Sequence, residues 1–561
     1  MYFRLVSLTA LLSIEWATVC SAAKVPSRRE QVPLLVAEQS KPTKRVAIVG
    51  GGTGGVTALK TLLGDLPSET TRDWEIVLFE QHRDVGGVWL PDLEPPNYPE
   101  LPGTPLYPRL KTNTPHPTMT IPNFPFRPLT DLYPHHPYVQ QYHADIISHW
   151  NLSSYLRLNH EVLESRWLGT SEDGHWRLDV LDHVQGRTIQ ANFDHLIVAN
   201  GHNHYPYEPT FEGREKWLEQ SSDRIVFHSI FYREPEDYAG KNVLVVGGGA
   251  SGRDIALQVV GIANSTTVSL KSTERTNNPA FPSIPGAAFK PRISHFTSDS
   301  VVFSDSSELA HIDTVILATG YDYRIPFLTA GGHLDEISTS VTLDSTHPAA
   351  IAASKSEHLV TNHRYIRPLF SHVLSLDTAY PLGALYFIGL PVFVANAISD
   401  TAGALFTAHT IANASLLSSR EEFLEDLSRQ EREVSRVGDP WYIGHRQVNT
   451  QGPSEESNQD RLVRYLQVRG VDQDDDTGGS HRHGSGIIPP KGKNFTEDWR
   501  ILGRGQGDLL KKGWERVKAS GRDTVRQWLA GRETEGEWAD LLRKLIRWEK
   551  EQEKESVAKS L

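Results

Sequence analysis

The chain has 561 residues, enough for two or three domains that each bury a core. Hydrophobic residues make up 38% and charged residues 22%, as in ordinary globular proteins, and a formal net charge of −12 gives no support for nucleic-acid binding. No stretch reaches the roughly 18 uninterrupted apolar residues that a membrane-spanning helix needs, so no transmembrane span is predicted.

The N-terminus has the pattern of a secretory signal peptide. Arg4 gives a positive start, Leu5–Ile14 is apolar, and small residues follow at Ser21-Ala-Ala23. We therefore predict that residues 1–23 direct the chain into the secretory pathway, for retention or secretion. Glu15 interrupts the apolar run, and the alternative is a disordered tail on a cytoplasmic protein. Four glycosylation acceptors fit secretory passage: Asn151, Asn264, Asn413 and Asn494.

Cys20 is the only cysteine, and it lies inside this N-terminal segment. A processed chain would contain no thiol, which excludes disulfide stabilisation and cysteine-based redox catalysis. No metal site is predicted.

Two glycine-rich turns follow hydrophobic strands almost 200 residues apart. The first glycine of such a turn permits tight bending, the second lets the backbone approach a pyrophosphate, and the third lets the next helix pack against the strand. Free N–H groups at the helix start then face the phosphates. Two turns of this kind predict two dinucleotides in one chain. Their glycines are Gly50, Gly52 and Gly55 in the first turn, and Gly247, Gly249 and Gly252 in the second.

The next predicted strand, Trp74–Glu80, ends in an acidic residue. Glu80 stands 25 residues after Gly55, near the spacing at which a carboxylate accepts hydrogen bonds from an adenosine ribose. From Leu90 to Pro137 the chain is rich in proline and aromatic residues, which predicts loops that wrap a pocket.

Two similar strand endings, Ala199-Asn-Gly201 and Ala318-Thr-Gly320, bracket the second glycine-turn unit. This predicts an α/β protein in which the second dinucleotide-binding domain is inserted into the first. The expected parts are residues 40–204 and 311–430 for the first domain, 205–310 for the second domain, and 431–561 for a helical C-terminal extension with a linker near 472–486.

An apolar stripe at helical spacing marks the end of this extension. We expect a helix that packs on the body of the protein, with a membrane-binding or partner-binding helix as the alternative. The stripe consists of Trp538, Leu541, Leu542, Leu545 and Trp548.

Over roughly residues 45–415 the chain resembles flavin-containing monooxygenases. The resemblance is carried by both glycine turns, Glu80, Gly86-Gly-Val-Trp89, Leu110-Lys-Thr-Asn113-Thr-Pro115, His228 with Tyr232, and Ala318-Thr-Gly320. It implies two Rossmann-like domains, with FAD at the first turn and NADPH at the second. The cofactor contacts that it implies are Gly50, Gly52, Gly55, Glu80, Gly87 and Trp89 for FAD, Gly247, Gly249 and Gly252 for NADPH, and Thr319 and Gly320 at the return crossing.

The residues after the second strand of the inserted unit favour NADPH over NADH. Lys271 and Arg275 offer positive charge where an NAD site would carry an acidic residue, although Glu274 weakens this preference.

Asn113 matches the active-site asparagine of the family, which lies beside the flavin ring and the nicotinamide amide. A neutral amide can hydrogen-bond there without supplying a proton that hastens loss of hydrogen peroxide from a flavin hydroperoxide. The alternative is a structural asparagine in a turn before Pro115.

The resemblance implies a monooxygenase that uses NADPH, O2 and a small-molecule substrate, and that passes one oxygen atom to a soft nucleophile, an amine nitrogen or a thiol or thioether sulfur. Baeyer–Villiger oxidation of a ketone is the alternative, although members of that group usually place Trp where this chain has Tyr232. A non-catalytic cofactor-binding scaffold is the remote alternative, the absence of a Cys-x-x-Cys pair excludes a disulfide reductase, and a homodimer stays open.

The chain departs from the family pattern in two places. Ser222 and Arg224 stand where a family fingerprint has Phe and Gly, so we interpret His228 as a domain-junction residue. The helix after Pro391 lacks the acidic and glutamine pattern that is usual in the family. The resemblance therefore does not predict the substrate specificity of this chain.

Overall fold

The computed structural model describes residues 42–96, 98–271, 284–337, 346–448, 457–471 and 487–560. The predicted signal peptide with Cys20, the residues Glu274 and Arg275, and the linker at 472–486 lie outside these ranges, so what we predict of them stays a prediction. Pro42–Leu561 forms one unit. None of the helices in the described ranges is both long enough and apolar enough to cross a membrane.

A seven-stranded sheet carries the first glycine turn, and its strands lie in the order β21-β22-β23-β7-β1-β2-β3. Strand β7 pairs in parallel with β1 on one side and with β23 on the other. The sheet therefore joins chain segments from before and after the second unit, as an inserted domain requires. The strands are β1 (Lys44–Val49), β2 (Trp74–Glu80), β3 (Leu156–Leu158), β7 (His195–Val198), β21 (Leu369–Phe370), β22 (Leu374–Ser375) and β23 (Leu385–Phe387).

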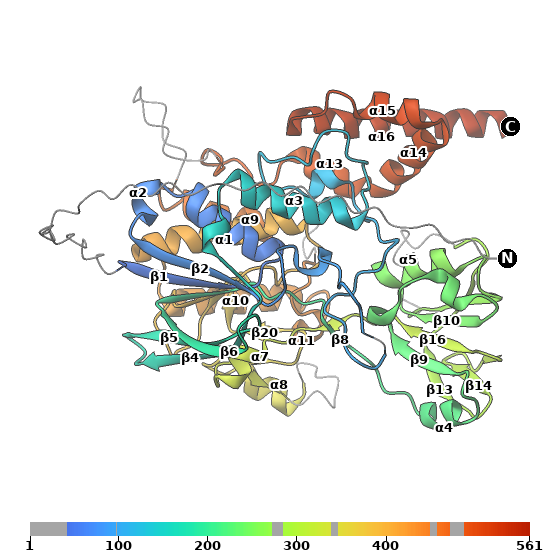
Figure 1. Ribbon diagram of the computed structural model, residues 1–561, viewed down its shortest axis with the longest axis horizontal. Helices are drawn as coiled ribbons and strands as arrows, with labels where there is room; N and C mark the ends of the chain where they lie inside the picture. The colour runs from blue at the N-terminus through green and yellow to red at the C-terminus, as the bar shows by residue number, and fades with distance from the viewer. Residues whose placement is uncertain are drawn as a thin grey trace, which may run out of the picture. The chain divides into compact units, whose positions relative to one another are not determined.

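Both faces of this sheet are covered (Figure 1). Val46 and Ile48 of β1 pack in one core with helices α1 (Thr53–Gly64) and α9 (Asn396–Ala412). The alternate residues, Ala47 and Val49, pack in a second core with a three-stranded antiparallel sheet. Burial on both faces of the sheet explains why β1 is hydrophobic at every position from Val46 to Val49. The antiparallel sheet consists of β4 (His160–Gly169), β5 (Gly174–Asp182) and β6 (Arg187–Phe193).

A five-stranded parallel sheet carries the second glycine turn, in the order β12-β11-β10-β16-β9. With the first sheet it confirms the predicted α/β fold of two dinucleotide-binding units. Strand β16 lies between β10 and β9, so the second unit includes Thr314–Leu317, and the boundary expected at residue 310 falls too early. The elements are β9 (Ile225–His228), β10 (Asn242–Val246), α5 (Ala250–Val259), β11 (Ser265–Ser269), β12 (Ala288–Lys290) and β16 (Thr314–Leu317).

The two crossings between the units run side by side. Strand β8 (Tyr205–Pro206) leads out of the first unit, β17 (Tyr321–Asp322) leads back, and the two pair antiparallel. The short ladder fixes the two connections against each other.

The other elements are shorter or lie around the two sheets. They are α2 (Ser68–Thr71), α3 (His136–His149), α4 (Arg214–Glu219), β13 (Ile293–Phe296), β14 (Ser300–Phe303), β15 (Glu308–Ala310), α7 (Pro326–Ala330), β18 (Asp335–Glu336), α8 (Pro348–Ala353), β19 (Val360–Thr361), β20 (Ile366–Arg367), α10 (Arg420–Val434), α11 (Pro440–Ile443) and α12 (Asn458–Gln467), with 3-10 turns at Gly87–Trp89, His116–Met119, Ser153–Tyr155, Ser229–Phe231, Pro235–Tyr238 and Ala414–Leu416.

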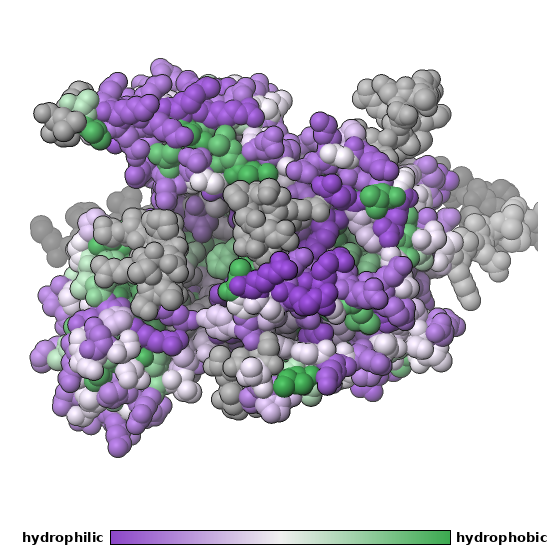
Figure 2. Space-filling view, turned by 180° about the vertical axis from the view of Figure 1, so that it is seen from behind, coloured by the Kyte–Doolittle hydropathy of each residue, from purple (hydrophilic) through white to green (hydrophobic). Residues whose placement is uncertain are grey.

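The C-terminal extension packs against the proline-rich stretch. Its predicted stripe lies on α16 and joins a core with Leu132 and Tyr133, which agrees with a helix that packs on the body of the protein. The face of these helices at the upper left of Figure 2 is mainly hydrophilic. They are α13 (Asp498–Gly505), α14 (Gly507–Ala519), α15 (Arg522–Leu529) and α16 (Glu535–Ser560).

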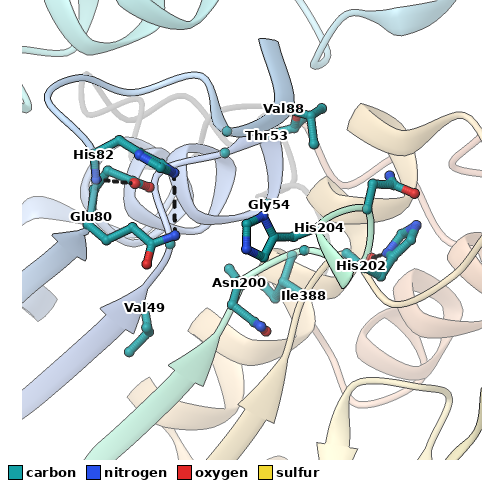
Figure 3. Close-up of a pocket in the computed structure, with 18 of the residues that line it drawn as sticks. Val49, Thr53, Gly54, Glu80, His82, Val88, Asn200, His202, His204 and Ile388 are labelled. Carbon is teal, nitrogen blue, oxygen red and sulfur yellow. Dashed lines mark hydrogen bonds between the residues drawn. The ribbon is translucent and has the colours of Figure 1, made fainter. Parts of the chain in front are cut away.

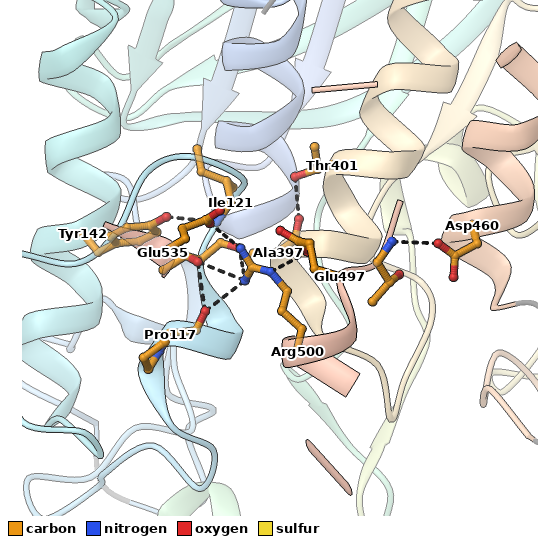
Figure 4. A network of polar contacts seen from close by, with 11 residues as sticks. Pro117, Ile121, Tyr142, Ala397, Thr401, Asp460, Glu497, Arg500 and Glu535 are labelled. Carbon is orange, nitrogen blue, oxygen red and sulfur yellow. Dashed lines mark hydrogen bonds and ion pairs between the residues drawn. The ribbon is translucent and has the colours of Figure 1, made fainter. Parts of the chain in front are cut away.

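A buried arginine ties this extension to the segment just after Asn113 (Figure 4). Arg500 has no exposed surface and donates to the carbonyl of Pro117 at 2.9 Å and to the hydroxyl of Thr120 at 3.0 Å. It also forms ion pairs with Glu497, at 2.9 Å, and with Glu535. A buried guanidinium needs such partners, because an unpaired buried charge is strongly destabilising.

The two glycine turns have the same backbone geometry. Gly50 and Gly247 have φ of +110° and +115°, in the region that favours glycine. A Cβ on Gly55 would lie 1.8 Å from the carbonyl oxygen of Gly50, and a Cβ on Gly252 would lie 2.2 Å from that of Gly247. Each third glycine therefore lets a helix touch the strand that precedes it.

Substitution of Gly252 by Ala should destabilise the protein by about 1–3 kcal/mol, because the new methyl group overlaps backbone. Gly249→Ala is the matched control: Gly249 has a φ of −72°, and a Cβ there meets no atom of the described residues within 4 Å. Denaturant unfolding of both variants measures the difference. Equal losses of stability would contradict the packing role of Gly252.

Candidate functional site

A pocket lies at the carboxyl ends of β1, β2, β7 and β23, the edge at which parallel sheets bind ligands (Figure 3). The glycine turn and the start of α1 form one wall, and the residues after β7 and β23 form the opposite wall. Lining residues used below are Gly50, Gly52, Thr53, Glu80, Gly87, His202, Gly389 and Asp400.

The first wall has the construction of a pyrophosphate site. Helix α1 begins at Thr53, its N-cap Gly52 offers no side chain, and its first turn carries no acidic residue. The N–H groups and the partial positive charge at the helix start are therefore available to an anion. Gly87 lies against this turn, because a Cβ on Gly87 would be 2.9 Å from the Cα of Gly52. The structure thus brings Gly50, Gly52 and Gly87 together, with Gly55 beneath them.

Glu80 is held rigidly at one end of the pocket. It is buried, one carboxylate oxygen accepts from the N–H of Gly51 at 2.5 Å, and the other accepts from the N–H of His82 at 2.8 Å. Each oxygen keeps a second lone pair for a further donor, such as a ribose hydroxyl. The position predicted from the spacing is therefore chemically suited to that contact.

Two residues that the family resemblance assigned do not line this pocket. Trp89 is half-buried and packs against the core beneath α1 and α9. Asn113 is exposed and is not one of the lining residues. Their roles beside the flavin stay predictions.

The second turn repeats the first at the carboxyl edge of the five-stranded sheet. Helix α5 begins after Gly249, without a side-chain cap and without an acidic residue in its first turn. No described residue lies within 4 Å of a Cβ placed on Gly249, so the described part of the chain leaves this helix start accessible. The second turn thus has the arrangement that a pyrophosphate site requires at Gly247, Gly249 and Gly252.

Lys271 lies two residues beyond β11, at the same edge, and donates to the hydroxyl of Tyr442 at 2.6 Å. The guanidinium groups of Arg364 and Arg446 lie 5.2 and 5.9 Å from the same tyrosine ring. The Lys271 hydrogen bond, with the three nearby positive charges, lowers the pKa of Tyr442. Arg364 and Arg446 are distant in sequence from Lys271, and no local pattern indicated them.

Thr319 and Gly320 bind the outgoing connection. The Thr319 hydroxyl donates to the carbonyl of Tyr207 at 2.5 Å. His228 accepts from the N–H of Ile230 at Nδ1, so its Nε2 carries the proton that points at the carbonyl of Gly320, 3.0 Å away. Burial lowers the pKa of His228 to about 4, which keeps the ring neutral. These contacts agree with a junction residue.

The sequence reasoning missed Asp400 and His202 as pocket residues. Asp400 lies on α9 with 5% of its surface exposed, and burial raises its pKa to about 7. His202 points Nδ1 at the carbonyl of Gly389, 2.9 Å away, and burial lowers its pKa to about 4. A lone acidic residue in a helix of small and apolar residues was the available signal for Asp400.

Across the described ranges, no group of three or more His, Cys, Asp or Glu is arranged to hold a metal ion. The polar groups of both sites instead suit dinucleotides: bare helix starts for phosphates, a fixed carboxylate for a ribose in the first site, and positive charge in the second.

Comparison with known proteins agrees with this construction. The family model FMO-like, flavin-binding monooxygenase-like, matches residues 43–283 and 274–339, more than half of the chain. Thiol-specific monooxygenase from Saccharomyces cerevisiae is 31% identical over 357 residues, 61% of this chain and 75% of that protein. Senecionine N-oxygenase from Tyria jacobaeae is 26% identical over 356 residues, 61% of this chain and 68% of that protein.

Among solved structures, S-allyl-L-cysteine S-oxygenase from Allium sativum matches with a TM-score of 0.62 at 20% identity, over 90% of this chain and 98% of that one. A likeness at that identity shows a shared fold. The family match and the two dinucleotide sites together show that the chain belongs to the flavin-binding monooxygenases and is an enzyme that depends on FAD and NADPH.

Proposed function

We propose that this enzyme oxygenates the nitrogen or sulfur atom of a small molecule. The observation that carries the proposal is the pair of dinucleotide sites with matching glycine turns, joined through the crossing at Thr319 and Gly320. A thiol-specific monooxygenase and an N-oxygenase among the relatives support nitrogen or sulfur as the acceptor atom.

The residues of the first site would hold FAD, which supplies the chemistry of oxygen transfer when bound. The start of α1 with Gly50 and Gly52 would bind its pyrophosphate, and Glu80 its adenosine ribose. The second turn would bind the pyrophosphate of NADPH. The protein positions these groups and excludes water.

The enzyme loaded with FAD should oxidise NADPH faster when a thiol, thioether or tertiary amine is added, and the product should contain one oxygen atom from isotopically labelled O2. Product analysis by mass spectrometry, with ketones as a parallel set, measures this. Esters or lactones formed from ketones alone would favour Baeyer–Villiger oxidation. NADPH oxidation that no substrate stimulates would contradict the proposal.

We propose that Asn113 limits the loss of reducing power as hydrogen peroxide. Its segment is fixed to the second unit, because the Tyr107 hydroxyl donates to Asp254 on α5 and Arg109 pairs with Glu236 at 2.5 Å. These contacts support the proposal, because they hold the segment of Asn113 beside the unit that would bind NADPH.

Asn113→Ala should raise the ratio of hydrogen peroxide to oxygenated product several-fold, by roughly the worth of one hydrogen bond. Peroxide and product are measured in the same assay against consumed NADPH. Lys111→Ala, at an exposed position two residues away, is the control and should behave as the unaltered enzyme. An unchanged ratio in Asn113→Ala would assign it the structural role.

We propose that Lys271, Arg364 and Arg446 bind the 2′-phosphate of NADPH. All three surround Tyr442, and Lys271 lies at the sheet edge where a dinucleotide presents its adenosine ribose. Two of the three come from the part of the chain that follows the inserted unit, so the cofactor would be held from both sides.

Lys271→Met and Arg364→Met should each raise KM for NADPH by about tenfold, the worth of one charge-assisted hydrogen bond, and leave KM for NADH nearly unchanged. Steady-state kinetics with both cofactors measures this. Lys355→Met, an exposed lysine, is the charge-matched control. Equal effects on both cofactors would show that the cluster does not contact the phosphate.

A further inference from the structure

The first pocket contains a buried carboxyl group that the protein leaves without a partner. Asp400 lines the pocket with 5% of its surface exposed, and no described residue donates a hydrogen bond to it or pairs with it. Glu80, at the other end of the same pocket, accepts two backbone N–H groups. Burial of a carboxyl without such donors is costly, and the raised pKa of Asp400 reflects this cost. A ligand that brings donors would relieve it.

The sheet order fixes where Asp400 lies along a bound dinucleotide. In the order β23-β7-β1-β2, the strand that ends at Glu80 lies on one side of β1, and the strand that leads to Gly389 lies on the other. Helix α1 starts directly after β1, between the two. A Cβ on Gly389 would lie 3.9 Å from Oδ1 of Asp400, so Asp400 marks the side opposite Glu80.

The start of α1 also touches the wall that leads to Asp400. A Cβ on Gly54 would lie 3.2 Å from the side chain of Ile388, the residue before Gly389. The path from Glu80 through the helix start to Asp400 is therefore continuous along the pocket wall. Along the FAD molecule, the adenosine ribose is followed by the pyrophosphate and then by the ribityl chain, which is the same order. The ribityl chain carries a run of hydroxyl groups.

We propose that Asp400 accepts hydrogen bonds from the ribityl hydroxyls of FAD and anchors the flavin half of the cofactor. This rests on the placement of FAD in the first site under the proposed function. The contact needs no proton transfer, because each hydroxyl donates and the carboxylate oxygens accept. Asp400 is thus a binding residue, and its partner is a polyol.

The test measures binding to the apoprotein, with FAD and with ADP as probes, by titration calorimetry. ADP fills only the half of the site between Glu80 and the start of α1. Asp400→Ala should weaken FAD binding by about tenfold or more and leave ADP binding within about twofold, because a lost hydrogen bond to a charged group affects only the ligand that makes it. Asp400→Asn should lose less, since its amide oxygen still accepts.

Ser399→Ala is the control, a buried neighbour on the same helix that does not line the pocket, and it should leave both affinities unchanged. Unchanged FAD binding in Asp400→Ala would overturn the proposal, even if KM for an amine substrate rises. Equal losses for FAD and ADP would also overturn it. The assay contains neither NADPH nor substrate, so a failure to find oxygenation leaves its outcome untouched.

Discussion

Two close contacts between backbone atoms, each of which leaves no room for a side chain, fix where both dinucleotide-binding helices of this enzyme begin. At Gly55 and at Gly252 a helix lies directly against the carbonyl of the strand end before it. That contact puts each helix start at the carboxyl edge of its sheet, with its N–H groups facing outward. The carboxylate of Glu80 and the positive charge of Lys271 come from the next strand in each sheet, so their places depend on it as well.

The connection between the two units consists of two short chain segments. The chain leaves through β8 and returns through β17, and these two segments pair with each other. Thr319, Gly320 and His228 add side-chain and backbone bonds at the same point. A motion of one unit against the other would bend this ladder, and any cofactor held from both sides would resist it.

The sequence was sufficient to predict those features that a local pattern of residues determines. A buried strand followed by three spaced glycines predicted both turns, and the spacing to Glu80 predicted a carboxylate that the structure places in the pocket. The place of Thr314–Leu317 was mistaken, because strand pairing depends on neighbours far along the chain. The same limit applies to the contact of Lys271 with Tyr442, which spans 171 residues, and to Asp400, whose chemistry arises from burial.

The bond between Arg500 and Pro117 joins residues that are 383 positions apart. Domains generally fold as units from the N-terminal side during synthesis, but the segment that follows Asn113 cannot complete its packing then. Leu132 and Tyr133 also stay uncovered until the last helix is made, because they pack against it. The nascent enzyme therefore exposes the apolar side chains of Leu132 and Tyr133 until the final helices are made, a period in which chaperones have reason to bind it.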